Sequence, residues 1–128
     1  MDVKVTPRVP PRTFAVGRRH PIVLKDCARI ELDADEQVTF VTQAGAEYDV
    51  ARKSWGFYAT PSLNGRLREF GLRAVLVKSP AERFYVMLVE RGQEAGFHDY
   101  LILEGHSIVT WLDEDAPLQA LERGARTP

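Results

Sequence analysis

The spacing of apolar residues changes repeatedly in the second half of the chain, and these changes constrain the fold more than any other feature. Four stretches rich in β-branched and aromatic side chains predict strands, and two stretches with apolar residues three and four positions apart predict helices. In chain order, the expected elements are a strand at 55–59, a helix at 61–70, strands at 72–78 and 83–90, a helix at 92–104 and a strand at 107–112. This β-α-β-β-α-β order is that of a ferredoxin-like unit.

The first of these helices has recognisable ends in the sequence. Thr60 is a suitable N-cap, Pro61 fits the first helical position, and Gly71 fits the C-cap. Gly65 weakens the helix interior by up to about 1 kcal/mol. We therefore expect a strand to lead directly into a helix N-terminus near residue 60.

Three shorter segments before residue 55 alternate apolar and polar side chains. They lie at 28–32, 37–42 and 47–52, and the segment 43–46 between the last two supplies a turn. We expect an N-terminal antiparallel β meander followed by the β-α-β-β-α-β unit, in a single α+β domain. The alternative is one continuous, strongly curved antiparallel sheet with two helices on one face.

The ends of the chain differ from its middle. A length of 128 residues suits one domain. Three prolines within residues 1–12 exclude a helix or a central strand, so we expect an extended arm there, either disordered or laid on another surface. We assign residues 13–113 to the α+β domain and residues 114–128 to a flexible or short-helical tail.

Composition excludes several classes of protein. Seventeen Lys and Arg against eighteen Asp and Glu give a net charge of −1, so we expect no nucleic-acid partner. No apolar run approaches the ~18 residues that span a bilayer, so we expect no transmembrane segment and a cytoplasmic setting. The single cysteine, Cys27, cannot form an intrachain disulfide, and we interpret it as a buried structural residue.

The charges are nevertheless arranged in blocks of alternating sign. Residues 1–30 hold seven basic residues against two acidic ones, and residues 51–91 hold eight against three. Residues 31–50 hold six acidic residues and no basic one, and residues 92–128 hold seven acidic against two basic. Such blocks complement one another within a domain or across an oligomer, or they are simply solvated faces.

The densest group of side chains suited to ligand binding starts at residue 52. Arginines there can form forked hydrogen bonds with phosphate or carboxylate, and the expected helix N-terminus offers free N–H groups. Indole and phenol rings provide flat faces for a sugar ring. The sequence thus predicts a site for a phosphorylated sugar or nucleotide sugar, although the same aromatic residues could fill the core and the hydroxyls could cap the helix. The candidate ligand-binding residues are Lys53, Trp55, Tyr58, Thr60, Ser62, Asn64, Arg66 and Arg68.

No set of catalytic residues is recognisable. The chain contains no GxSxG, GxGxxG or GxxxxGK[ST] motif, no HExxH and no CxxC. We therefore assign no catalytic residue, no metal ligand and no cofactor. A small enzyme on the same substrates would use Tyr58, His106 or an acidic residue as acid and base.

Several runs of the sequence resemble those of small uncharacterised bacterial proteins encoded near surface-polysaccharide (O-antigen-type) biosynthesis genes. They are Asp-Glu-Gln-Val-Thr-Phe at 35–40, Glu-Tyr-Asp-Val at 47–50, Trp-Gly-Phe-Tyr-Ala-Thr-Pro-Ser-Leu-Asn at 55–64, Val-Met-Leu-Val-Glu at 86–90 and Trp-Leu-Asp at 111–113. The likeness covers about residues 35–113, and its most specific part is Trp-Gly-Phe-Tyr-Ala-Thr-Pro. It implies a cytoplasmic setting and a sugar pathway, and it carries no assigned activity.

These observations lead to a main hypothesis and two alternatives. The main hypothesis is a non-catalytic accessory or ligand-binding protein of bacterial surface-polysaccharide biosynthesis, which binds a partner enzyme or a phosphorylated sugar. The first alternative is a small isomerase or hydrolase acting on a sugar nucleotide. The second is a structural homo-oligomer, in which the N-terminal arm wraps a neighbour and exposed edge strands pair.

Overall fold

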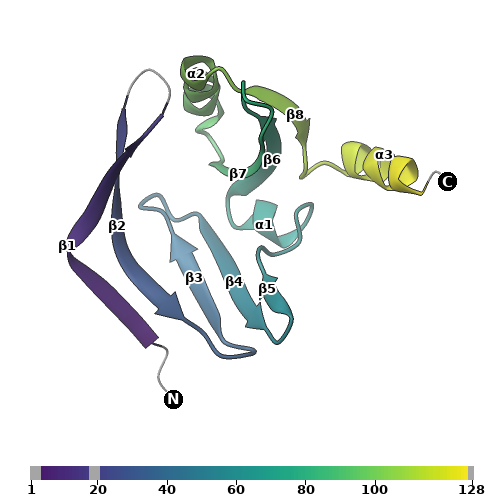
Figure 1. The fold of residues 1–128 in the computed structure, drawn as a ribbon. Helices are drawn as coiled ribbons and strands as arrows, with labels where there is room; N and C mark the ends of the chain where they lie inside the picture. The colour runs from purple at the N-terminus through teal and green to yellow at the C-terminus, as the bar shows by residue number, and fades with distance from the viewer. Residues whose placement is uncertain (1–3, 18–20, 127–128) are drawn as a thin grey trace.

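A computed structural model describes residues 4–17 and 21–126 and shows an α+β fold, as predicted (Figure 1). Its strands form three antiparallel sheets, with the orders β1-β2, β3-β4-β5 and β7-β6-β8. The elements are β1 (Lys4–Val16), β2 (Ile22–Glu31), β3 (Gln37–Val41), β4 (Glu47–Lys53), β5 (Gly56–Tyr58), α1 (Arg66–Glu69), β6 (Leu72–Lys78), β7 (Phe84–Glu90), α2 (Glu94–Glu104), β8 (Ser107–Trp111) and α3 (Asp115–Ala125).

β1 and β2 form a long two-stranded ribbon, which we call the arm. Residues 1–3 of the expected extended arm lie outside the described residues; from Lys4 the strand runs to Val16 and pairs with β2 from Lys4↔Glu31 to Val16↔Ile22. The prolines of β1 are tolerated because each strand of a two-stranded ribbon is an edge strand. The register shifts between Pro7 and Arg12, where β1 bends (Figure 1). Nearly every residue of the arm is exposed, including Cys27, so the expectation of a buried cysteine was wrong.

The second sheet contains the predicted hairpin. β3 pairs with β4 from Gln37↔Ala51 to Val41↔Glu47, and the backbone N–H of Thr42 donates to the Ala46 carbonyl at 2.9 Å to close the turn. β2 pairs with β1 rather than with β3, so the first three predicted strands are divided between two sheets.

The pairing of β5 determines how the strands of the second half of the chain are divided between sheets. A two-residue turn folds it directly back onto β4, where Gly56, at a φ of +146°, pairs with Lys53. Such a short connection costs little loop entropy, so this pairing prevails over a distant one. The predicted β-α-β-β-α-β order is present, but β5 does not join β6, β7 and β8, and the four-stranded ferredoxin-like sheet is therefore not formed. The alternative of one continuous sheet is likewise not observed.

β6 is the centre of the third sheet and of the core. Successive side chains of a strand point to opposite faces, and β6 buries both of its faces. One apolar cluster contains Ala46, Leu67, Leu72 and Ala74, and the other contains Val75, Val77, Val89 and Leu101. α1 and the start of β4 cover the first face, and α2 covers the second.

α1 is much shorter than predicted and does not begin at Pro61. Its N-cap is Gly65, which has no side chain to accept a hydrogen bond from the helix. Ser62 directs the local structure instead, because its Oγ accepts a hydrogen bond from the Arg66 N–H at 2.8 Å and its carbonyl accepts one from the Leu67 N–H at 3.1 Å. The expected roles of Thr60 and Pro61 in starting a helix were therefore wrong.

α3 is longer than the single turn that the sequence suggested. It projects from the body on the side opposite the arm (Figure 1), and none of its residues is buried. Within the described ranges, no helix is long and apolar enough to cross a membrane.

Candidate functional site

A hollow of about 300 Å³ lies on one face of the β3-β4-β5 sheet, next to α1, and it brings together three of the eight predicted residues. These are Tyr58, Ser62 and Arg66. An adjoining hollow of about 170 Å³ shares Arg66 with it and extends toward Glu47. We call the two hollows the sheet groove. The remaining side chains that line the first hollow are Gln37, Asp49, Ala51 and Pro61.

Asp49 and Arg66 define the polarity of the sheet groove. The Arg66 Nη2 lies 3.4 Å from the Asp49 Oδ2, and Thr39 donates its Oγ1 hydrogen to the Asp49 Oδ1 at 2.6 Å. The Arg66 guanidinium also lies over the Phe70 ring, 5.1 Å from its centroid. Asp49 is largely buried, whereas Arg66 is mostly exposed. The guanidinium is thus held at the edge of the groove with free donors.

Tyr58 completes the groove with an aromatic face. Its place on β5 opposite Ala51 puts it on the same sheet face as Asp49, because the side chains of residues 49 and 51 point the same way. Tyr58 is 58% exposed, so its ring is available to a ligand. Sequence reasoning missed Asp49 and Gln37, since strand alternation indicates a shared face but not which segment will cover it.

The other five predicted residues do not join the groove. Lys53 forms an ion pair with Asp35, and the Asn64 Nδ2 donates to the Asp115 Oδ1 at 2.8 Å. Trp55 lies in the β4–β5 turn and is 70% exposed, which contradicts the alternative that it fills the core. Thr60 does not cap α1, as described above. The helix N-terminus expected near residue 60 is therefore not formed: α1 begins at Arg66, and Ser62 accepts the hydrogen bonds of the Arg66 and Leu67 N–H groups.

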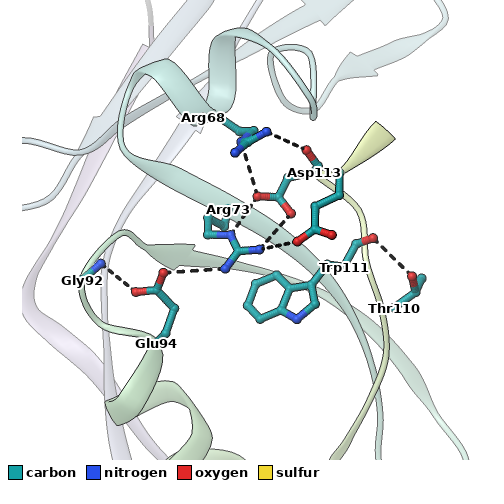
Figure 2. Close-up of polar contacts among 8 residues, drawn as sticks. Arg68, Arg73, Gly92, Glu94, Thr110, Trp111 and Asp113 are labelled. Carbon is teal, nitrogen blue, oxygen red and sulfur yellow. Dashed lines mark hydrogen bonds and ion pairs between the residues drawn. The ribbon is translucent and has the colours of Figure 1, made fainter. Parts of the chain in front are cut away.

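Arg68 belongs to a separate charged cluster centred on Asp113, which is fully buried (Figure 2). Arg73 donates to the two Asp113 oxygens, at 2.8 Å and 3.4 Å, and the Arg68 Nε lies 3.7 Å from the Asp113 Oδ2. The Arg73 guanidinium also lies 3.9 Å from the Trp111 ring centroid and bonds Glu114 at 3.1 Å. The hydrogen bonds to Asp113 raise the pKa of Arg73.

The same cluster includes Glu94, the first residue of α2. Hydrogen bonds from the backbone N–H groups of Glu94 itself and of Gly92 lower the pKa of Glu94, and the nearby Arg73 lowers it further. The cluster therefore holds β6, the segment after β8 and the start of α2 together. Its charges pair with one another, although the buried Arg68 Nε has no hydrogen-bond partner among the described residues, and we assign the cluster to stability rather than to ligand binding.

A larger and more apolar hollow of about 630 Å³ lies between the arm and the β7–α2–β8 region. We call it the tip hollow. His106 stands between two tyrosines there, with its ring 6.2 Å from that of Tyr85 and 6.1 Å from that of Tyr100. Glu104 lines the same hollow, whereas Tyr58 lines the sheet groove. Tyr58 and His106, which the enzyme hypothesis named together, therefore belong to different hollows.

Metal binding is not indicated by the described residues, since no group of three or more His, Cys, Asp or Glu side chains among them is placed to hold an ion. Comparison with family models, with curated proteins and with solved structures found no match to this chain.

Proposed function

We propose that the protein is a non-catalytic accessory protein that binds a sugar ring in the sheet groove. The observation that carries this proposal is the pairing of Asp49 with Arg66 beside the exposed Tyr58 ring. Carboxylate and guanidinium groups are planar and can engage two neighbouring hydroxyls at once, while an aromatic ring stacks on the apolar face of a sugar. The amide of Gln37 and the hydroxyl of Ser62 add donors and acceptors at the rim.

The charge of the groove favours the uncharged part of the ligand. Asp49 and Glu47 line the groove against one cation, Arg66. A phosphoryl group beside Asp49 would meet a like charge and would compete with that carboxylate for the guanidinium. We therefore narrow the expected ligand, a phosphorylated sugar or nucleotide sugar, to one whose sugar ring occupies the groove and whose phosphate lies outside it.

The biological setting is part of the same proposal. The resemblance to proteins encoded near surface-polysaccharide genes is the reason to propose a role in bacterial glycan assembly, in the cytoplasm, beside a partner enzyme. A protein that binds the sugar and passes it on needs no acid–base pair at the sheet groove.

Calorimetric titration of the full chain with glucose, with a nucleotide sugar such as UDP-glucose and with inorganic phosphate tests the ligand. We expect heat from both sugars and none from phosphate, with Arg66→Ala and Tyr58→Ala each weakening binding at least tenfold. Arg83→Ala and Tyr85→Ala are matched controls outside the groove and should bind as the parent does. Binding of phosphate alone, or loss of binding only in Tyr85→Ala, would refute the proposed site.

A small enzyme remains the second candidate, because one hollow contains both an acid and an imidazole. Glu104 and His106 line the tip hollow with Tyr100, and the His106 Nδ1 is buried without a hydrogen-bond partner among the described residues. A proton acceptor in a concave site is the pattern of an acid–base enzyme. Conversion of UDP-glucose followed by proton NMR, and its loss in His106→Gln, would favour this candidate over the first.

A further inference from the structure

The chain exposes more surface than a folded monomer of its size. Its accessible surface is 9241 Å², whereas a folded monomer of 14.5 kDa exposes about 6,900 Å². The excess of about 2,300 Å² exceeds the ~800 Å² that each partner buries in a standard interface and suits an obligate homodimer. Two elements, the arm and α3, project from the body and account for the shape (Figure 1).

The arm carries an unpaired apolar strip near its tip. Phe14 pairs with Leu24, and two positions further on Val16 pairs with Ile22, so all four side chains lie on one face of the ribbon. Each is between 37% and 44% exposed. An isolated two-stranded ribbon is marginally stable in water unless a further strand or a helix packs on its face.

α3 projects from the body and carries an apolar side that could cover the strip on the arm. It is amphipathic, and Leu118, Leu121 and Ala125 recur at helical spacing along one side. Its beginning is tied to the body by the hydrogen bond that the Asn64 Nδ2 donates to the Asp115 Oδ1. A helix of eleven residues is marginal in water without a surface to cover.

The arm is basic, whereas the end of the chain that contains α3 is close to neutral. The described part of the arm holds five basic residues against two acidic ones, and residues 114–126 hold three acidic against two basic. Lys25 and Arg29 of β2 have no acidic partner among the described residues, whereas Glu114 bonds Arg73 and Asp115 bonds Asn64. Two basic ribbons repel one another, so the arm favours a different element of the second copy over a second arm.

We propose that the protein is a symmetric homodimer in which α3 of each copy packs on the apolar strip of the other copy's arm. Within one chain the contact cannot form, because the arm and α3 project on opposite sides of the body (Figure 1). A twofold axis makes the exchange reciprocal, so one contact occurs twice and the assembly closes as a dimer. The sheet groove is not part of this interface, and the inference is independent of sugar binding.

Sedimentation equilibrium of the full chain and of two variants tests the exchange. Leu24→Arg alters the arm, Leu121→Arg alters α3, and Ile102→Arg is the matched control, because Ile102 is 78% exposed on α2. We expect a dimer for the parent and for the control. Each of the other two variants should raise the dissociation constant more than tenfold, because a buried leucine at two equivalent contacts is lost.

Mixing the two variants distinguishes an arm–helix contact from the alternatives. A mixed dimer regains one intact contact, between the arm of the Leu121→Arg chain and α3 of the Leu24→Arg chain. The mixture should therefore dimerise more tightly than either variant alone. A monomeric parent at sub-millimolar concentration would overturn the proposal. So would dissociation by only one of the variants, which indicates arm–arm or helix–helix pairing, or a mixture no tighter than its components. Circular dichroism of each variant checks that these exposed substitutions leave the fold intact.

Discussion

Removal of the Asp113 carboxylate should destabilise the fold more than any other single charge change among the residues of Figure 2. Asp113 is fully buried, and it is the acceptor on which Arg73 and Arg68 converge. Asp113→Ala leaves two guanidinium groups facing a site from which their counter-charge has gone. The loss therefore has to be estimated from the penalty of breaking a buried pair and not from the modest net value of a surface ion pair.

The structure sets the size of this effect. Breaking a buried ion pair by removing one partner costs about 3–5 kcal/mol. Arg73 remains bonded to Glu114 at 3.1 Å, and its side chain is 20% exposed, so water reaches part of it. We expect the low end of the range, about 3 kcal/mol, for Asp113→Ala, and about half of it for Asp113→Asn, which keeps one acceptor oxygen.

Urea unfolding followed by tryptophan fluorescence measures this free energy. Trp111 lies under the Arg73 guanidinium and should report the loss of the cluster directly. Asp99→Ala, on the exposed surface of α2, is the control and should change stability by less than about 0.5 kcal/mol. If Asp113→Ala were no more destabilising than this control, the reasoning from burial would be refuted.

Three further predictions concern single residues. The pKa of Glu94 is lowered in the folded state, so its contribution to stability is fully present above the ordinary pKa of 4.5 and is lost as the pH falls through the lower folded pKa. Glu94→Gln should therefore make the urea midpoint less sensitive to acid. An unchanged dependence of the urea midpoint on pH would contradict this prediction. Gly71 has a φ of +92°, and an added Cβ would lie 3.4 Å from the Ala46 Cβ, so Gly71→Ala should destabilise the fold by about 1–2 kcal/mol. An added Cβ at Gly124 in α3 meets open space, so Gly124→Ala should stabilise the fold by up to about 1 kcal/mol. Equal changes in the free energy of urea unfolding would refute this prediction. Leu67→Ala, at a fully buried position, should destabilise the fold by about 2–5 kcal/mol and lower the melting temperature. Ile102→Ala, at an exposed position, should leave the melting temperature nearly unchanged. Similar melting temperatures for the two variants would contradict the assignment of the core.

Local patterns predicted the elements between residues 72 and 112 closely. The strand expected at 72–78 is β6, and the helix expected at 92–104 is α2 apart from its first two residues. These elements carry their own signals, namely apolar periodicity, turn residues and a glycine after the helix, and Gly105 does adopt the left-handed conformation there.

Pairing between strands was less accessible to sequence reasoning. The order of elements does not predict that β5 pairs with β4. That pairing depends on the low entropy cost of closing a two-residue turn, compared with the cost of the longer loop that would join β5 to the β7-β6-β8 sheet. The same limit applied to the arm, where prolines correctly excluded a central strand but did not exclude an edge strand in a two-stranded ribbon.

The candidate site was predicted in part for a similar reason. Tyr58, Ser62 and Arg66 share the sheet groove because a short loop brings α1 over the sheet. Arg68 follows Arg66 by two positions, so it lies on a different side of α1 and contacts Asp113 instead. Asp113 is 45 positions further along the chain, and no local pattern connects it with Arg68. The ion-pair partner of a cation is a tertiary property, and it decides which cations remain for a ligand.

Amide NMR of the labelled full chain during titration with UDP-glucose is the most direct test of the sheet groove. Our account predicts shifts concentrated at residues 49, 58, 62 and 66, reproduced by glucose and not by phosphate. Shifts concentrated instead at residues 85, 100 and 106 around the tip hollow, or no shifts at millimolar sugar, would contradict it.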